Sequence, residues 1–273
     1  MPLLSCLDIT DRTIDYYALD ISPVEVCRSL DAMLLHPFKH VRCHGLIGTF
    51  DDARSWLQST QNIDRPKCLV SLGSSIGNLT EPEATYFLNG FRQTLCRRKD
   101  SVTELQSSNT GPFSTMLIGL DSCKSEKRVR AAYNDPDGLN AKFLLNALEH
   151  VNKLLGYEAF CTQEWVVQGE WIDGCYKQCL VPLRDVDFEG TCLAAGTKVH
   201  MVQSQKYGAQ DKTRLWGSAG FRELHNWRYE EDAYGKSWYF ISGFAMPIRP
   251  KKLTCFAGDD SMISMLAVDS GDA

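Results

Sequence analysis

The chain has 273 residues, of which 44% are hydrophobic and 23% charged. This composition is close to the globular average and excludes a collagen-like, coiled-coil or largely disordered chain. At roughly 100–200 residues per domain, there is room for one large domain or two small ones. The formal net charge of −5 and the lack of long Lys/Arg runs argue against nucleic acid as a partner.

Cysteine usage and hydropathy indicate the compartment. The eleven cysteines are odd in number and include no Cys-x-x-Cys pair, so we expect reduced, mostly buried thiols rather than a disulfide scaffold. The first residues lack the pattern of a secretory leader, and no apolar run approaches the length that a membrane span needs. The sequence therefore predicts a cytoplasmic protein without a membrane partner.

The first half of the chain alternates short apolar runs with amphipathic segments. The expected strands lie at residues 14–19, 40–47, 68–72 and 115–120. The expected helices lie at residues 23–34, 51–57 and 81–95. Strand and helix alternating at this spacing indicate right-handed crossovers and a parallel sheet, so the fold class is α/β. The polar segment 97–114 is predicted to be a solvated loop.

The second half begins with a helical period over residues 125–156. Residues 164–204 then read as short antiparallel strands, with Asp173-Gly174 and Glu189-Gly190 at the bends. A helix at 209–218 and strands at 221–227 and 238–244 are expected to return to the parallel sheet. From Pro250 onward the sequence has little pattern and is predicted to be a loose tail.

Two segments lie where a parallel sheet binds ligands. Asp20 ends the first predicted strand, at the sheet edge where an acidic residue commonly binds a ribose. The structural alternative is that Asp20 or Ser22 begins the next helix. Residues 71–78, SLGSSIGN, follow another strand, and their small side chains let the backbone approach a ligand closely. Alone, this segment is equally compatible with a plain turn.

Other motifs do not point to a function by themselves. The segments AAYNDP at 131–136 and QSQKY at 203–207 would each pass as surface. His40, Cys43 and His44 do not form a convincing metal site, because alternate strand residues face opposite ways and no fourth ligand is near in sequence. A Walker-type phosphate loop does not occur in the sequence.

Seven segments in order resemble one family: YYALDIS, HGLIGTFDD, SLGSSIGN, LIGLDSCK, AAYNDPDG, KFLLNALEHVN and QSQKY. They are similar to the histidine-specific S-adenosylmethionine-dependent methyltransferases, which include the ergothioneine-pathway histidine Nα-methyltransferases and the fungal dimethylallyltryptophan N-methyltransferases of ergot alkaloid synthesis. The resemblance covers residues 14–244. It implies a class I methyltransferase (Rossmann-like) sheet domain at 1–124, an inserted α+β substrate-binding lobe at 125–204, a return to the sheet at 205–249 and a tail at 250–273.

The resemblance also implies site residues. With S-adenosylmethionine as cofactor, Asp20 would hold the ribose, and Thr49 and Phe50 would flank the adenine. The family usually has an acid at the position of Thr49, so the adenine contact differs here. The residues matching the family's amino-acid pocket are Gly73, Ser75, Asn78, Tyr133 and Ser204. No dedicated catalytic base is implied, since Tyr133 and Asn78 would act by orienting the substrate.

One departure from the family bears on the substrate. In the histidine enzymes a glutamate two residues before the position of Ser204 binds the imidazole, and here Val202 stands in its place. Losing that acceptor disfavours histidine by roughly tenfold to a hundredfold and favours an indole side chain. The expected reaction is therefore N-methylation of a prenylated tryptophan such as 4-dimethylallyltryptophan, with histidine as the alternative substrate.

A second departure lies at the amino-terminal end. The family has a first strand and a glycine-rich loop before the ribose acid, whereas few residues precede the strand at Ile14. We therefore expect an N-terminally truncated chain, with the edges of the neighbouring strands exposed. A non-catalytic paralogue that no longer binds the cofactor is the other alternative. The sequence does not predict an oligomeric state.

Overall fold

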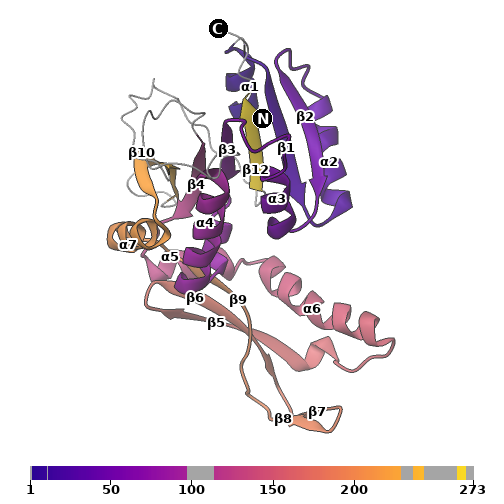
Figure 1. Cartoon of the computed structure of the whole chain (residues 1–273). Helices are drawn as coiled ribbons and strands as arrows, with labels where there is room; N and C mark the ends of the chain where they lie inside the picture. Colours follow the sequence, from indigo (N-terminus) through magenta and orange to yellow (C-terminus); the bar gives the residue numbers. More distant parts are fainter. Residues whose placement is uncertain (1, 11, 97–113, 229–235, 243–262, 269–273) are drawn as a thin grey trace. The chain divides into compact units, whose positions relative to one another are not determined.

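The computed structural model describes residues 2–10, 12–96, 114–228, 236–242 and 263–268 (Figure 1). They form two compact units, which are described separately. The first unit comprises residues 1–76, 81–121 and 209–273, and the second comprises residues 77–80 and 122–208. The predicted loop at 97–114 lies outside the described residues except for Ser114.

The first unit contains most of the sheet and helix elements expected from the first half of the chain. Its helices are α1 (Pro2–Asp8), α2 (Pro23–Leu34), α3 (Phe50–Leu57), α4 (Glu81–Cys96) and α7 (Ala209–Ala219). Its strands are β1 (Ile14–Asp20), β2 (Val41–Ile47), β3 (Lys67–Ser71), β4 (Thr115–Asp121), β10 (Arg222–Arg228), β11 (Lys236–Ser242) and β12 (Ile263–Val268). The short turn η1 (Ser75–Asn78) lies at the boundary with the second unit.

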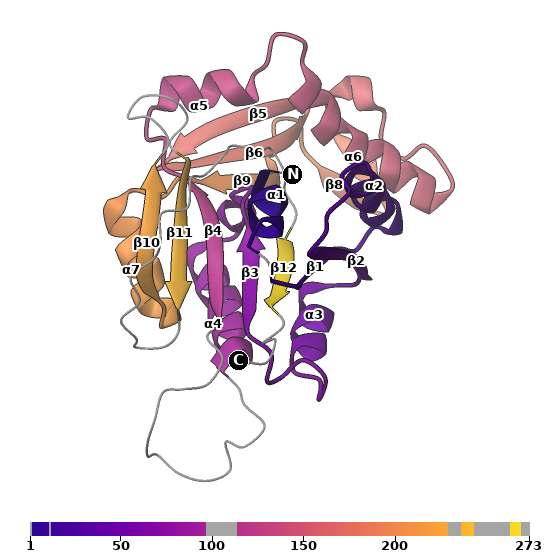
Figure 2. The same ribbon diagram turned by 90° about the horizontal axis from the view of Figure 1, so that it is seen from above.

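The seven strands form one sheet in the order β10-β11-β4-β3-β12-β1-β2, which can be followed across Figure 2. The pairs β1–β2 and β3–β4 are parallel, as expected. Strands β11 and β12 each run antiparallel to both of their neighbours. The fold is therefore α/β with a mixed sheet whose main strands are parallel.

Strand β12 corrects two expectations. The tail after Pro250 was predicted to be loose, yet Ile263–Val268 forms a strand between β1 and β3. Met265, for example, pairs with Tyr17 on one side and with Leu69 on the other. These two strands consequently do not have the exposed edges that the sequence led us to expect. Pairing across more than 180 residues leaves no local signal, because a short apolar run fits a strand or a buried loop equally well.

Both faces of the sheet are covered by helices. Alternate residues of a strand point to opposite faces, and in β1 Ile14, Tyr16 and Ala18 face a core cluster that includes Leu4 of α1 and Met33 of α2. On the other face, the ring of Tyr17 lies 4.6 Å from that of Trp56 in α3. Burial on both faces explains why the strand reads as a nearly continuous apolar run.

The second unit combines two helices with short antiparallel strands. The helices are α5 (Glu126–Tyr133) and α6 (Leu139–Leu155), and the turn η2 is Thr162–Glu164. Strands β5 (Trp165–Ile172), β6 (Cys175–Pro182) and β9 (Val199–Gln205) form a sheet in the order β5-β6-β9. Strands β7 (Val186–Phe188) and β8 (Thr191–Leu193) form a separate hairpin.

The two predicted bends of this unit are confirmed. Asp173 and Gly174 have φ angles of 50° and 80°, and Glu189 and Gly190 have φ angles of 50° and 79°. A two-residue hairpin turn with positive φ at both positions matches the right-handed twist of its strands. The core of the unit forms where α6 packs on the sheet, around Leu144, Leu148, Trp165 and Leu180.

The cysteines are only partly as expected. All described cysteines are free thiols, in agreement with the absence of a disulfide scaffold. The expectation that they are mostly buried is wrong, because only Cys175 and Cys179 are buried and the others lie at intermediate or exposed positions. Burial raises the pKa of both of these thiols, so neither is an activated nucleophile.

Candidate functional site

The predicted site residues divide between the two units. Those of the first unit are Asp20, Thr49, Phe50, Gly73 and Ser75. Those of the second unit are Asn78, Tyr133, Val202 and Ser204. The first group contains the predicted cofactor ligands, and the second contains most of the predicted substrate ligands.

Asp20 is the last residue of β1, at the carboxyl end of the sheet. Its Oδ1 atom accepts a hydrogen bond from the backbone N–H of Ser22 at 2.8 Å. The helix α2 is capped instead by Ser22, whose hydroxyl accepts from the N–H of Glu25. The Oδ2 atom of Asp20 has no hydrogen-bond partner among the described residues, so one carboxylate oxygen is available to a ribose hydroxyl.

Thr49 and Phe50 follow the neighbouring strand β2 and begin α3. The Thr49 hydroxyl accepts from the backbone N–H of Asp52, and the Asp52 carboxylate accepts from the backbone N–H of Thr49 at 2.8 Å, which completes a capping box. The Thr49 hydroxyl also donates to Asp52 at 2.7 Å. The Thr49 side chain therefore stabilises the start of α3, at the position where the family usually has an acid. Phe50 is 45% exposed, and its ring lies 5.1 Å from the ring of Phe87, so this aromatic residue is accessible at the end of the strand next to β1.

Gly73 and Ser75 lie in the loop after β3, at the same edge of the sheet as Asp20. Ser74 between them adopts a positive φ of 58°, and its hydroxyl accepts from the backbone N–H of Asp121 at 2.9 Å. Strand β12 lies between β1 and β3, which places this loop two strand spacings, about 10 Å, from the end of β1. Because β12 is antiparallel, its amino-terminal end is at this edge, and it does not supply a strand followed by a loop there.

The described residues of this edge thus fit the ribose and adenine ends of S-adenosylmethionine. Asp20 offers a carboxylate oxygen, and Phe50 offers an aromatic surface at the start of α3, which follows the adjacent strand β2. The methionine end has no such counterpart among the described residues of the edge.

In the second unit, Gly77 brings Asn78 to the end of β9. A Cβ atom on Gly77 would lie 2.8 Å from the backbone oxygen of Gln205, so only glycine permits this approach. Asn78 follows directly and is exposed. The close approach explains why a glycine is needed in SLGSSIGN beyond the general freedom of a turn.

Tyr133 ends α5 and stacks on Tyr176 of β6, with ring centroids 4.9 Å apart. Tyr176 is fully buried, and the lack of a side chain at Gly169 makes room for its hydroxyl. Asn134 donates a hydrogen bond to that hydroxyl at 3.4 Å. The stacked pair holds the Tyr133 ring in one orientation, which is what a substrate-positioning tyrosine requires.

Val202 and Ser204 lie two residues apart on β9 and therefore share a face of the sheet. Ser204 pairs with Tyr176, and Val202 pairs with Gln178. Val202 packs against the core cluster around Leu144 and Leu148. The structure thus brings Ser204 and Tyr133 together through Tyr176, with Val202 on the apolar side of the same face.

Sequence reasoning missed Lys206, which follows β9 and is only 3% exposed. Its Nζ atom donates a hydrogen bond to Ser204 Oγ at 2.8 Å and lies within 3.4 Å of the Tyr133 hydroxyl. Lys124 in turn donates to the backbone oxygen of Lys206. Lysine in a polar segment such as QSQKY usually indicates an exposed side chain, so the sequence contained no signal of this burial.

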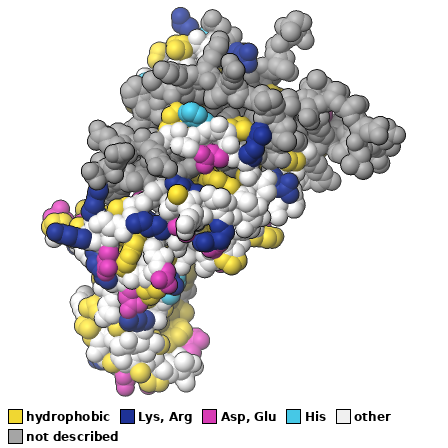
Figure 3. All heavy atoms as spheres, turned by 90° about the vertical axis from the view of Figure 1, so that its left-hand side faces the viewer, with side chains coloured by type: hydrophobic (Ala, Val, Ile, Leu, Met, Phe, Trp, Pro, Cys, Tyr) yellow, Lys and Arg dark blue, Asp and Glu magenta, His cyan; other side chains and the backbone are white. Residues whose placement is uncertain are grey.

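On the face shown in Figure 3, acidic and basic side chains of the described residues are interspersed. No described helix has the length and apolarity to cross a membrane. The described part of the chain contains no group of three or more metal-binding side chains, and His44 instead binds Asp15 at 3.0 Å.

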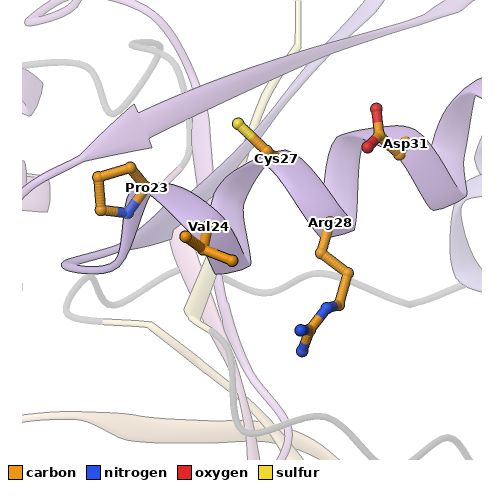
Figure 4. Close-up of a pocket in the computed structure, with 5 residues that line it drawn as sticks. All are labelled: Pro23, Val24, Cys27, Arg28 and Asp31. Atoms are coloured by element: carbon orange, nitrogen blue, oxygen red, sulfur yellow. The ribbon is translucent and has the colours of Figure 1, made fainter.

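A shallow pocket runs along α2, lined by Pro23, Val24, Cys27, Arg28 and Asp31 (Figure 4). Its one cation, Arg28, is paired with Glu25 at 2.9 Å. None of the predicted site residues lines it. We therefore assign it no part in the site.

Comparison with known proteins decides the family. The profile described as "Histidine-specific methyltransferase, SAM-dependent" matches residues 1–240. The chain belongs to this family. The resemblance seen in seven short segments is thereby confirmed over most of the chain. The seven-stranded sheet described above is therefore the sheet of a member of this methyltransferase family.

Three fungal relatives illustrate the range of the family. The chain is 38% identical over 237 residues to "Ergothioneine biosynthesis protein 1" of Neurospora crassa, covering 85% of this chain and 25% of that protein. It is 31% identical over 242 residues to "N-methyltransferase imqF" of Aspergillus flavus, covering 86% of this chain and 62% of that protein. It is 32% identical over 240 residues to "4-dimethylallyltryptophan N-methyltransferase easF" of Trichophyton verrucosum, covering 84% and 67%. The chain thus spans a quarter of the first relative and less than two thirds of the second.

Proposed function

We propose that this chain forms an S-adenosylmethionine-dependent N-methyltransferase module that acts on the amino group of an amino acid with an indole side chain, such as 4-dimethylallyltryptophan. Family membership supports methyl transfer from S-adenosylmethionine. The relative of Trichophyton verrucosum, whose name includes this substrate, supports the choice of amino acid. A cytoplasmic location is part of the proposal, and the free thiols support it.

The observation that carries the indole assignment is the position of Val202. Its side chain shares a sheet face with Ser204 and packs against the apolar cluster of α6. A ring system with a large hydrocarbon surface gains from contact with such a side chain, by about 25 cal/mol per Å² of apolar surface buried. An imidazole has less apolar surface and here lacks the carboxylate partner of the histidine enzymes.

A second candidate substrate is histidine. The specific observation in its favour is the 38% identity to the Neurospora crassa protein, compared with 32% to the Trichophyton verrucosum enzyme. The two candidates share the same reaction and the same proposed backbone contacts. They differ only in what binds the substrate's ring.

When bound, S-adenosylmethionine would supply a methyl group from its sulfonium sulfur to the substrate's amine nitrogen, with Asp20 holding its ribose and Thr49 and Phe50 beside its adenine. Near pH 7 an α-amine with a pKa of about 7.7–8.0 loses its proton to water at a cost of about 1 kcal/mol, so no strong base is needed. We assign Tyr133 and Asn78 to hold the amino and carboxylate groups. Gly73 and Ser75 would let the backbone approach the substrate, and Ser204 would contact its side chain. Such alignment contributes several kcal/mol to catalysis.

The proposal is tested in two steps. Calorimetric titration with S-adenosylhomocysteine should show binding, and the Asp20→Ala variant should bind at least tenfold more weakly, because the ribose hydroxyls lose their acceptor. Incubation with methyl-labelled S-adenosylmethionine and 4-dimethylallyltryptophan, tryptophan or histidine should label the indole amino acids preferentially. Absence of heat at high micromolar ligand, together with no labelled product, would favour the non-catalytic alternative and refute the proposal.

A further inference from the structure

The side-chain amide nitrogen of Gln178 is buried without a hydrogen-bond partner among the described residues. Gln178 is 2% exposed, and its Nε2 atom makes no hydrogen bond with the described part of the chain. Buried side-chain amides in folded proteins are almost always paired, so an unpaired one requires an explanation. A ligand that supplies the missing hydrogen bond is such an explanation.

The position of this amide is defined by strand pairing. Gln178 lies on β6, directly opposite Val202 of β9. Side chains of directly paired residues lie on the same face of a sheet. Two residues away along β6, Tyr176 pairs with Ser204. Gln178 therefore shares its face with Val202 and Ser204, the residues that match the family's side-chain pocket.

On this face, Gln178 is the polar group nearest in strand register to Val202. A glutamine amide presents a carbonyl acceptor and an NH₂ donor, and a half-turn of its last torsion exchanges them. It can therefore turn its oxygen toward a donor in a ligand. Unlike a carboxylate, the neutral oxygen does not favour a positively charged ring over a neutral one.

We propose that Gln178 is a specificity-determining residue whose side-chain oxygen accepts a hydrogen bond from the ring N–H of the substrate. The substrate class is an amino acid whose aromatic ring carries an N–H group. This inference rests on the proposed function for the existence of an amino-acid substrate. It adds the group that recognises the substrate's ring. That group is the amide of Gln178 on β6, which pairs with Val202 at the position where the family's carboxylate is replaced.

The test compares each amino acid with its ring-N-methylated counterpart, which cannot donate. The pairs are 4-dimethylallyltryptophan with its 1-methyl derivative, tryptophan with 1-methyltryptophan, and histidine with both ring-methylated histidines. Dissociation constants are measured by calorimetry with S-adenosylhomocysteine present. The wild-type protein should bind the N–H form of at least one pair about tenfold to a hundredfold more tightly. If no pair is separated in this way, the proposal is wrong.

The variant Gln178→Met nearly preserves the side-chain volume and removes both ends of the amide. It should reduce the preference for the N–H form to about one, mainly by weakening binding of that form. Gln168→Met on β5 is the control, because Gln168 is exposed and faces the other side of the sheet. A preference retained in Gln178→Met overturns the proposal, and the wild-type comparison remains decisive if this variant does not fold.

Failure of this inference differs from failure of the proposed function. The inference is measured by ligand binding alone, whereas the proposed function is measured by methyl transfer and S-adenosylhomocysteine binding. Methyl transfer to indole amino acids without discrimination against the ring-methylated forms would leave the function standing and remove Gln178 from it.

Discussion

The ammonium group of Lys206 donates to the hydroxyl of Ser204 over 2.8 Å and to the hydroxyl of Tyr133 over 3.4 Å. An ammonium group has donors only. Each hydroxyl that accepts from it consequently has its own hydrogen directed elsewhere. Lys206 therefore turns Ser204 and Tyr133 into donors toward a ligand, which suits a substrate carboxylate or another acceptor.

Replacing Lys206 with Met should weaken amino-acid binding by about tenfold, since hydrogen bonds to charged groups contribute about 1.5–3 kcal/mol. Turnover at saturating substrate should change less than KM. Lys198→Met is the control, because Lys198 is exposed and forms only a surface ion pair with Glu170. Equal losses in the two variants, or a KM unchanged in Lys206→Met, would contradict this role.

Replacing glycine with alanine should change the unfolding free energy in opposite directions at Gly77 and at Gly217. Gly77→Ala places a methyl group 2.8 Å from the Gln205 backbone oxygen, which forces η1 away from β9. We expect a loss of about 1–3 kcal/mol in unfolding free energy and weaker amino-acid binding through Asn78. Gly217→Ala in α7 meets no atom within 4 Å and should stabilise by up to about 1 kcal/mol. Chemical denaturation of both variants would reveal the contrast, and equal effects would argue against the close approach at Gly77.

Asp15 joins β1 to two cations and a histidine. Its carboxylate accepts from Arg65 at 2.7 Å, from Arg42 at 2.8 and 3.0 Å, and from His44 at 3.0 Å. Burial alone would raise the pKa of Asp15, but the hydrogen bonds from Arg65, Arg42 and His44 outweigh it and lower the pKa to about 2. The ionised carboxylate therefore stabilises the folded state, by about 2 kcal/mol at neutral pH.

This stabilisation is complete above the ordinary carboxyl pKa of 3.8 and is lost as the pH falls through about 2. The variant Asp15→Asn should thus be less stable than the wild type at pH 7 by about 2 kcal/mol or more, and the difference should shrink steadily below about pH 4. Urea unfolding at several pH values measures it. If the difference in unfolding free energy between the two proteins does not depend on pH, the contacts of Asp15 stabilise the fold by packing rather than by charge.

Strand β12 predicts a pattern of hydrogen exchange. Because residues 263–268 pair on both sides, their amide hydrogens should exchange about as slowly as those of β1 and β3. Met265→Pro removes a backbone donor in the middle of the sheet and should cost about 3 kcal/mol or more. Fast exchange at residues 263–268, or a Met265→Pro variant of unchanged stability, would rule out this pairing.

The sequence predicted what depends on local or nearest-neighbour pattern. The apolar run ending in Asp20 predicted strand β1 and the position of Asp20 at the sheet edge. The Asp173-Gly174 and Glu189-Gly190 pairs predicted two hairpins. Features that depend on distant contacts were not predictable. Lys206 contacts Tyr133, which lies 73 residues earlier in the chain, and β12 pairs with strands that are remote in sequence. Thr49 shows a third case, in which a capping box competes with the role implied by the family.

Val202 gives the sharpest test of substrate choice. Val202→Glu places a carboxylate on the face shared by Ser204 and Gln178, where an imidazole N–H could bind it. The ratio of kcat/KM for histidine to that for 4-dimethylallyltryptophan should rise by roughly tenfold to a hundredfold. Because Val202 packs against the core cluster of α6, the unliganded variant should also lose about 1–3 kcal/mol of stability. Val202→Thr, which adds a hydroxyl without a charge, is the control and should change the ratio far less. If Val202→Glu destabilises the protein and leaves the ratio unaltered, the side chain at this position is part of the core only, and the preference for an indole must be decided elsewhere in the lobe.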